Sequence, residues 1–156
     1  MYYISRKGHE KLLEEIKAID NDIIDVRRLI GESAARDNDL RENKEFMDLR
    51  VKAMYELPNK KRTLWDIYQQ SQIIEDMLEY KNFDGKQIII GSVVDLDFAG
   101  DKCTYTILGS SEGDIDNDII SCDAPLSKAL LGKKIGEKVI FNNQTIHVLA
   151  IRKYEN

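Results

Sequence analysis

The chain of 156 residues has only two cysteines, two prolines and no run of about 18 apolar residues. Cys103 and Cys122 form no C-x-x-C pair and have no histidine nearby, which excludes a disulfide framework and a recognisable zinc site. The first residues, MYYISRKGHEKLLEEI, lack the apolar region of a signal peptide. We therefore expect a cytoplasmic protein without a membrane partner, and we expect both cysteines to be small core residues.

The net charge of the chain is also small. The formal net charge is -5, with 33% charged and 42% hydrophobic residues. An acidic total opposes general adhesion to duplex DNA or anionic lipid, so any nucleic-acid contact must be local. The proportions are typical of one or two folded domains. His9 and His147 are far apart in sequence, and we expect neither to be a metal ligand or a base.

The first third of the chain has a helical apolar pattern. Spacings of four and three residues alternate, as in a coiled-coil seam, through Leu12, Ile16, Ile19, Ile23, Val26 and Ile30. The pattern predicts a helix from about Gly8 to Asp37, about 45 Å long at about 1.5 Å per residue. The polar stretch GESAARDND then interrupts the seam.

A second helical pattern follows the polar stretch. It runs through Phe46, Leu49, Ala53, Leu57, Leu64, Ile67, Ser71 and Ile74. Two long helices joined by a short polar turn are expected to lie antiparallel, each covering the apolar stripe of the other. Near Leu57 the spacing slips by one residue, and Pro58 lacks the amide hydrogen of a helix interior. We expect a kink or break there.

Beyond residue 76 the apolar period changes from helical to alternating. Four segments read as short strands: IIIGSVVDLDFAG, DKCTYTILG, KVIFN and QTIHVLAIRKY. The segment DAPLSKALLGKK predicts a short helix, with Pro125 in its first turn and Gly132 just past its end. The fold class is therefore α+β: a long antiparallel coiled-coil hairpin over residues 1–76, then a small antiparallel sheet domain with a short helix over 77–156.

Two carboxylates stand in the polar stretch between the helices, in ARDNDLREN. Asp39 followed by Glu42 three residues later has the spacing of a capping box at a helix start. A cap contributes about 1 kcal/mol and requires no ligand. From these residues alone, a cap is the simpler interpretation.

Four segments of the chain are similar to the sequence motifs of one known protein family. SRKGHEKLLEEI is similar to the family's T-x-x-G-x-x-K-L-x-x-E-L, and DLREN with Glu45 to its G-D-L-[KR]-E-N-A-E-Y. YTILGSSEGD is similar to Y-x-I-V-G-x-x-E-A-D, and ISCDAPLSKALLGKKIGEKV to I-S-x-x-S-P-L-A-x-A-L-L-G-K-x-x-G-D-x-V. In this order, the segments resemble the GreA/GreB family of bacterial transcript-cleavage factors. The resemblance covers nearly the whole chain and is closer to GreA.

The resemblance implies a fold, a partner and a site. The second domain is expected to have the FK506-binding-protein-like fold and to bind RNA polymerase. The hairpin is expected to enter the polymerase's secondary channel and to stimulate cleavage of the backtracked RNA 3′ end by the polymerase, so that the factor, a monomer, is not itself an enzyme. Asp39 and Glu42 are the expected catalytic pair, sharing a Mg²⁺ with the polymerase. The expected contacts to RNA or to the channel are Arg36, Arg41, Asn43, Lys44 and Phe46.

Several positions depart from the family's pattern. Asn38 replaces a glycine, Lys44 an alanine, Phe46 a tyrosine and Ala35 an arginine. Pro58 and one additional residue in the second helix are further departures. These changes concern the geometry of the tip and the straightness of the hairpin, whereas both carboxylates are present.

Three other functions fit parts of the sequence. A Gre-like protein could occupy the polymerase channel as an inhibitor without promoting cleavage. A prolyl isomerase with a helical arm is suggested only by the expected fold, and Tyr105, Phe98 and Phe141 are too few to line its pocket. A simple coiled-coil interaction module explains the seam but not the motifs of the second domain.

Overall fold

The computed structural model describes residues 2–36 and 39–155. Contacts divide the chain into two compact units. The helical unit is Glu10–Gln70, and the sheet unit is Met1–His9 together with Ser71–Asn156. These ranges differ from the expected domains 1–76 and 77–156, because both ends of the predicted hairpin segment pack with the sheet unit.

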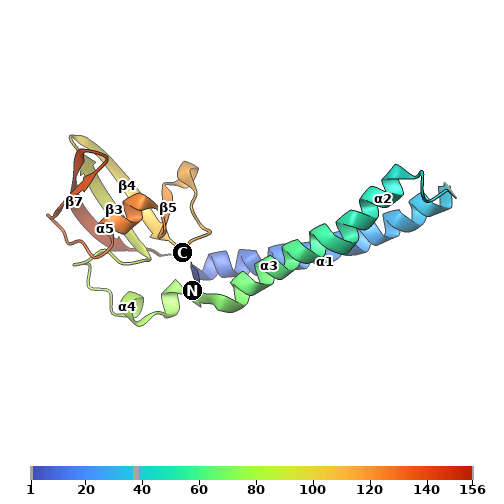
Figure 1. Ribbon diagram of the computed structural model, residues 1–156. Coiled ribbons are helices and arrows are strands. Elements are labelled where there is room, and N and C mark those ends of the chain that lie inside the picture. The colour runs from blue at the N-terminus through green and yellow to red at the C-terminus, as the bar shows by residue number, and fades with distance from the viewer. Residues whose placement is uncertain (1, 37–38, 156) are drawn as a thin grey trace. The chain divides into compact units, whose positions relative to one another are not determined.

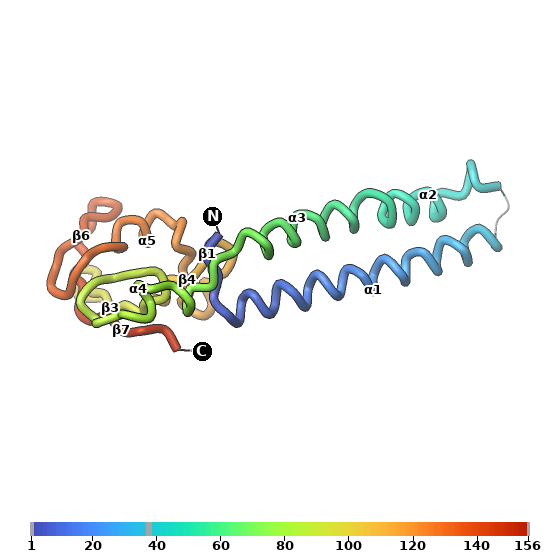
Figure 2. The backbone as a smooth tube through the Cα atoms, turned by 90° about the horizontal axis from the view of Figure 1, so that it is seen from below, coloured from blue at the N-terminus to red at the C-terminus, as the bar shows by residue number. Residues whose placement is uncertain are grey.

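The helical unit is an antiparallel hairpin (Figures 1 and 2). Its first helix, α1 (Arg6–Arg36), has 31 residues and begins in the sheet unit; at about 1.5 Å per residue it is about 46 Å long. The returning helix consists of α2 (Lys44–Val51), a π-helical segment (Lys52–Glu56) and α3 (Leu57–Gln70), which follow one another without a gap. The predicted pair of long antiparallel helices is confirmed.

The predicted seam is the core of this hairpin. On α1 the buried side chains are Leu12, Ile16, Ile19, Val26 and Ser33. Across the hairpin, Ile19 and Val26 share one apolar cluster with Ala53 and Leu57. Outside the seam, Lys60 Nζ lies 3.1 Å from the Glu15 carboxylate, which pairs the outer faces of the two helices.

The irregularity near Pro58 is a π-helical turn. The N–H of Leu57 donates to the carbonyl of Lys52, five residues earlier, so one additional residue fits into the helix. Ala53 and Leu57 both remain buried on the seam despite their spacing of four. The helix therefore does not break: it absorbs the additional residue as a π turn and continues through Pro58, which lies at the second residue of α3. The kink, the other form of this expectation, stays a prediction.

The expected second helix is too long at its C-terminal end. Helix α3 ends at Gln70, and Ser71 begins the strand β2 (Ser71–Ile73), which pairs in parallel with β1 (Tyr2–Ile4). A 3₁₀ turn (Ile74–Asp76) and α4 (Leu78–Lys81) follow. Ile74 is fully buried, but in a cluster of the sheet unit with Tyr80 and Leu108. Its helical spacing was therefore misleading.

The sheet unit contains a five-stranded sheet in the order β5-β4-β3-β7-β6. Each of the four predicted segments contains one strand: β3 (Ser92–Phe98), β4 (Asp101–Leu108), β6 (Lys138–Phe141) and β7 (Gln144–Lys153). These strands pair antiparallel. The short β5 (Ile119–Ser121), which was not predicted, pairs in parallel with β4 and follows a 3₁₀ turn (Ile115–Asn117). The expected α+β class, a long hairpin with a small sheet domain, is confirmed.

The short helix α5 (Pro125–Leu130) begins and ends as predicted. Pro125 occupies its first turn, and Gly132 just beyond it has φ +82°, a value that glycine adopts without strain. Leu130 from this helix lies in the main core with Val94, Ile107 and Val148 of the sheet. Helix α5 therefore packs against the sheet as expected.

Both cysteines are free thiols in this unit. Cys122 is buried in the main core, and Cys103 is partly buried against it. Burial raises the pKa of each thiol above its ordinary value, because the thiolate would lose its hydration. Within residues 2–36 and 39–155, no helix is long and apolar enough to cross a membrane.

Candidate functional site

The two predicted carboxylates lie in one tight turn at the end of the hairpin. We call residues 39–43 the tip turn. The carbonyl of Asp39 accepts hydrogen bonds from the N–H of Glu42 at 3.2 Å and of Asn43 at 3.0 Å. The Asp39 side chain accepts a further bond at its Oδ1 from the Arg41 N–H, at 3.2 Å. Asp39 and Glu42 are both exposed, so the turn presents two carboxylates to solvent.

The capping box predicted for this pair is wrong. Helix α2 begins at Lys44, and its N-cap is Asn43, whose Oδ1 accepts from the N–H of Phe46 at 2.9 Å. Asp39 lies a full turn earlier and organises the bend that precedes the helix. Both acids therefore precede the capping residue of α2, and the simpler interpretation of the pair, a capping box at this helix start, does not hold.

Asn43 also connects the tip turn to α1. Its Nδ2 donates to the Ser33 carbonyl at 3.2 Å and lies 3.1 Å from the Ser33 hydroxyl. Ser33 is fully buried, and its hydroxyl is also within reach of Glu45 Oε2, at 3.2 Å. This polar contact holds the start of α2 against the end of α1, and so it determines where the tip turn lies within the hairpin.

The cationic residues of the tip differ in their partners. Arg36, at the end of α1, forms an ion pair with Glu45 at 2.9 Å, and both side chains remain largely exposed. Arg41 and Lys44 are exposed beside the carboxylates. Such surface pairs contribute little to stability, on the order of 0.5 kcal/mol. Arg41 in the tip turn and Lys44 at the start of α2 are exposed cations that an anion can approach.

Two of the expected contact residues face inward. Asn43 and Phe46 are both buried, and the guanidinium of Arg50 lies 5.6 Å from the centre of the Phe46 ring. Their burial makes them supports of the tip rather than surfaces open to RNA. The remaining departure at the tip, Asn38, lies outside the described residues.

The sequence analysis did not identify Ser33 as a buried residue of the hairpin, although the spacing of the seam points to it. It lies three residues after Ile30, at the next position of the four-three seam. A single polar residue at a seam position often specifies the register of a coiled coil. Extending the seam by one step, rather than ending it at the polar stretch, would have identified Ser33 and suggested a polar partner on the second helix.

Sequence comparison relates most of the chain to a known family of proteins. GreA of Maridesulfovibrio salexigens is 32% identical over 144 residues, which are 89% of this chain and 84% of the relative. The chain belongs to the GreA/GreB family of transcription elongation factors. GreA of Bacillus subtilis is 31% identical over 146 residues, 89% of this chain and 86% of its own. The family model described as "Transcription elongation factor, GreA/GreB, C-term" matches residues 84–153.

The chain is also similar to a solved structure. GreA factor homolog 1 of Thermus thermophilus is 20% identical and covers 96% of this chain and 97% of its own, with a TM-score of 0.41.

The donors of the tip turn suit a hard divalent cation but do not complete a site. Asp39 and Glu42 offer carboxylate oxygens, the ligands that Mg²⁺ prefers. Mg²⁺ requires about six oxygens in an octahedron, and one oxygen of Asp39 already accepts from the Arg41 N–H. Among the described residues no group of three or more histidine, cysteine or acidic side chains could hold a metal. The pair fits a site whose other ligands come from a partner.

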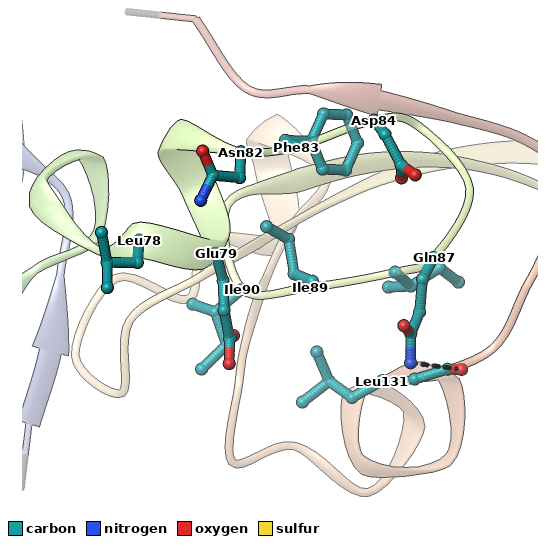
Figure 3. Close-up of a pocket in the computed structure, with 11 residues that line it drawn as sticks. Leu78, Glu79, Asn82, Phe83, Asp84, Gln87, Ile89, Ile90 and Leu131 are labelled. Atoms are coloured by element: carbon teal, nitrogen blue, oxygen red, sulfur yellow. Dashed lines mark hydrogen bonds between the residues drawn. The ribbon is translucent and has the colours of Figure 1, made fainter.

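The sheet unit has an open pocket between α4 and the end of α5 (Figure 3). Its wall includes Leu78, Ile89, Ile90 and Leu131, and Gln87 Nε2 donates to the Gly132 carbonyl at 3.0 Å along one side. Phe83 is the one aromatic residue among those that line it, whereas a site for proline isomerisation is an apolar pocket with aromatic walls. This pocket gives no support to the isomerase interpretation.

Proposed function

We propose that this Gre-family chain binds RNA polymerase, inserts its hairpin into the secondary channel and stimulates the polymerase's own cleavage of backtracked RNA. The polymerase is the enzyme, and this chain acts on it as a monomer. Cleavage shortens the extruded RNA so that its new 3′ end lies in the active site again. An arrested complex can then resume elongation.

The observation that carries this proposal is the exposure of Asp39 and Glu42 on a turn that is fixed to α1 by a buried polar contact. The carboxylates are solvated, so the isolated protein has no large cost for keeping two acids together. The turn they occupy is braced by the buried contact between Asn43 and Ser33. Groups that are positioned before binding lose less entropy when they meet their target.

The proposed role of the pair is to complete a metal site within the polymerase. Mg²⁺ held there would lower the pKa of a bound water and offset charge on the scissile phosphate. Asp39 and Glu42 would each contribute oxygens, with the remaining ligands from the polymerase and the RNA. Arg41 and Lys44, exposed beside them, are suited to approach the RNA phosphates.

The test is RNA cleavage in a stalled, backtracked elongation complex with the cognate polymerase. We expect the native protein to shorten the RNA, and the Asp39→Asn and Glu42→Gln variants to be at least about 100-fold slower, because each lacks one ligand charge. Asp48→Asn is the matched control: this exposed acid lies on α2 outside the tip turn and should leave the rate unchanged.

The same assay separates the proposed factor from a channel inhibitor. All proteins are compared at one Mg²⁺ concentration, and their binding to polymerase is measured in parallel. If the native protein binds and slows elongation but leaves the backtracked RNA intact, the proposed function is wrong and the chain is an inhibitor. If the Asp39 and Glu42 variants cleave as fast as the native protein, the pair has no role in the reaction.

A further inference from the structure

The inward-facing residues of the returning helix change phase at the π-helical segment. Those that are buried or partly buried include Phe46, Leu49 and Ala53 before the π turn and Leu57 and Leu64 after it. A regular helix with four-three spacing would continue from Ala53 to Glu56, which is charged and exposed, rather than to Leu57. The two halves of the helix are therefore one residue out of phase, and the π turn supplies the difference.

A second set of residues on α2 could face α1 without a π turn. Continued back from Leu57, the four-three spacing passes through Met54, Arg50 and Met47. Met47 and Met54 are 46% and 55% exposed in the structure, and methionine adapts its shape to an apolar contact. Arg50 could pack its stem on the seam and keep its charge in water. We call the observed arrangement the π register and this alternative the regular register.

The buried polar contact at the end of the hairpin distinguishes the two registers. Asn43 Nδ2 donates to the carbonyl and to the hydroxyl of Ser33, and both residues are buried. In the regular register each residue of α2 would take the place of the one before it, a rotation of about 100° and a shift of about 1.5 Å. Lys44 would then lie opposite Ser33, and the Asn43 amide would lose its partners there. A polar residue at a seam position specifies register in this way, whereas apolar residues tolerate either register.

We propose that Ser33 is a positioning residue: its contact with Asn43 holds α2 in the π register, and without it α2 rotates by one residue into the regular register. The Ser33 hydroxyl also lies 3.2 Å from Glu45 Oε2, so a second residue of α2 supports the same choice. The effect on RNA cleavage rests on the proposed function, because a rotated α2 would carry Asp39 and Glu42 to other positions. Reactions that depend on positioned groups are slowed by displacements of about 1 Å.

The register of the full chain can be measured without polymerase, by the rate at which hydrogen peroxide oxidises each methionine. Met47 and Met54 are exposed in the π register and would lie on the seam in the regular register. We expect Ser33→Ala to oxidise both at least about threefold more slowly than the native protein, because the rate follows the fraction of molecules that expose the sulfur. Met77, which is partly buried in the sheet unit, is the internal reference and should react at an unchanged rate. Mass spectrometry of the digested chain gives the three rates.

Two further variants sharpen this measurement. Thr63→Ala is the matched control: it also removes a hydroxyl from the hairpin, one that donates to the Asn59 carbonyl of its own helix at 3.1 Å, and it should leave the oxidation rates unchanged. Deletion of Tyr55, which is exposed in the π-helical segment, shortens the spacing from Ala53 to Leu57 to three, so that a regular helix places both on the seam. Added to Ser33→Ala, this deletion should restore the native oxidation rates.

RNA cleavage in the backtracked complex provides the functional measurement. Ser33→Ala should bind polymerase within about twofold of the native affinity but cleave at least about tenfold more slowly, and the deletion should restore the rate. Unchanged or faster oxidation of Met47 and Met54 in Ser33→Ala would overturn the inference, and so would slower oxidation that the deletion does not reverse. Slower oxidation that the deletion reverses, together with no cleavage by the native protein, would retain the register and reject the proposed function.

Discussion

Glu112 of the sheet unit and Glu42 of the tip turn are both glutamates in motifs that resemble the Gre family, but their surroundings differ. The Glu112 carboxylate accepts from the N–H of Ser5 at 2.7 Å, the N–H of Gly109 at 3.0 Å and the Ser5 hydroxyl. Glu42 is exposed, and its backbone N–H closes the tip turn. A carboxylate surrounded by donors is a structural acceptor, whereas one left in water remains available for a ligand.

The comparison also explains why two distant motifs belong together. A Cβ added to Gly8 would overlap Glu112 Oε1, and one added to Gly109 would overlap the Tyr3 carbonyl oxygen. The glycine of SRKGHEKLLEEI and the glycine and glutamate of YTILGSSEGD therefore form one contact within the sheet unit. These two motifs hold the residues before α1 against the end of β4. The DLREN motif instead exposes its carboxylates to solvent.

The sharpest test of this contact is Gly109→Ala. Because the added methyl group would overlap the Tyr3 backbone, β1 must move, and we expect the free energy of unfolding of the sheet unit to fall by about 3 kcal/mol or more. Hydrogen exchange of the β3 and β4 amides during denaturant titration measures this. Unchanged exchange rates would show that the sheet unit accommodates the methyl group and that the contact is not tight.

The two glutamates can be compared directly by the same isosteric change. Glu112→Gln replaces one acceptor oxygen with a donor and removes the charge, so we expect a loss of about 2 kcal/mol in unfolding free energy. Glu42→Gln should leave unfolding unchanged and affect only RNA cleavage. Thermal unfolding of both variants, followed by circular dichroism, gives the comparison; equal midpoints would remove the distinction between structural and available carboxylates.

Support of the tip turn by Asn43 is expected to have a smaller effect. Asn43→Ala removes the cap of α2 and the contact with Ser33, and we expect the helical unit to lose about 1 to 2 kcal/mol. Lys44→Ala, at the neighbouring exposed position, is the control and should have little effect. Fluorescence of Trp65, which lies in α3, can follow unfolding of this unit. If Asn43→Ala leaves the free energy of unfolding of the helical unit unchanged, the tip turn does not depend on this cap.

The smallest expected effect has the opposite sign. Gly31 lies in α1, and a Cβ added there would meet nothing within 4 Å. Gly31→Ala should therefore stabilise the helical unit by about 0.5 to 1 kcal/mol, because alanine loses less backbone entropy in a helix. The same fluorescence assay measures it. A destabilised variant would mean that Gly31 has a packing partner, which would reduce the contrast with Gly109.

Much of the fold follows from patterns that can be read along the chain. The four-three seam of α1 and the alternating strands β3 and β7 were predictable, because burial on one face requires apolar residues at the period of the element. The π turn was only half predictable: the slip in spacing and Pro58 located it, but not its form. Strands β1, β2 and β5 have three residues each, too few for a period, and they exist because distant segments pair with them.

At the tip, the residue types could be read from the sequence, whereas their arrangement depends on how the two helices pack. The residues supply two acids between two helices, and the order of the motifs indicates the family. Asp39 and Asn43 are equally good caps by local preference, so the sequence could not choose between them. Asn43 caps α2 because Ser33, buried on the opposite helix, meets its amide. That contact joins residues ten positions apart across the hairpin, and it exists only once the two helices have packed.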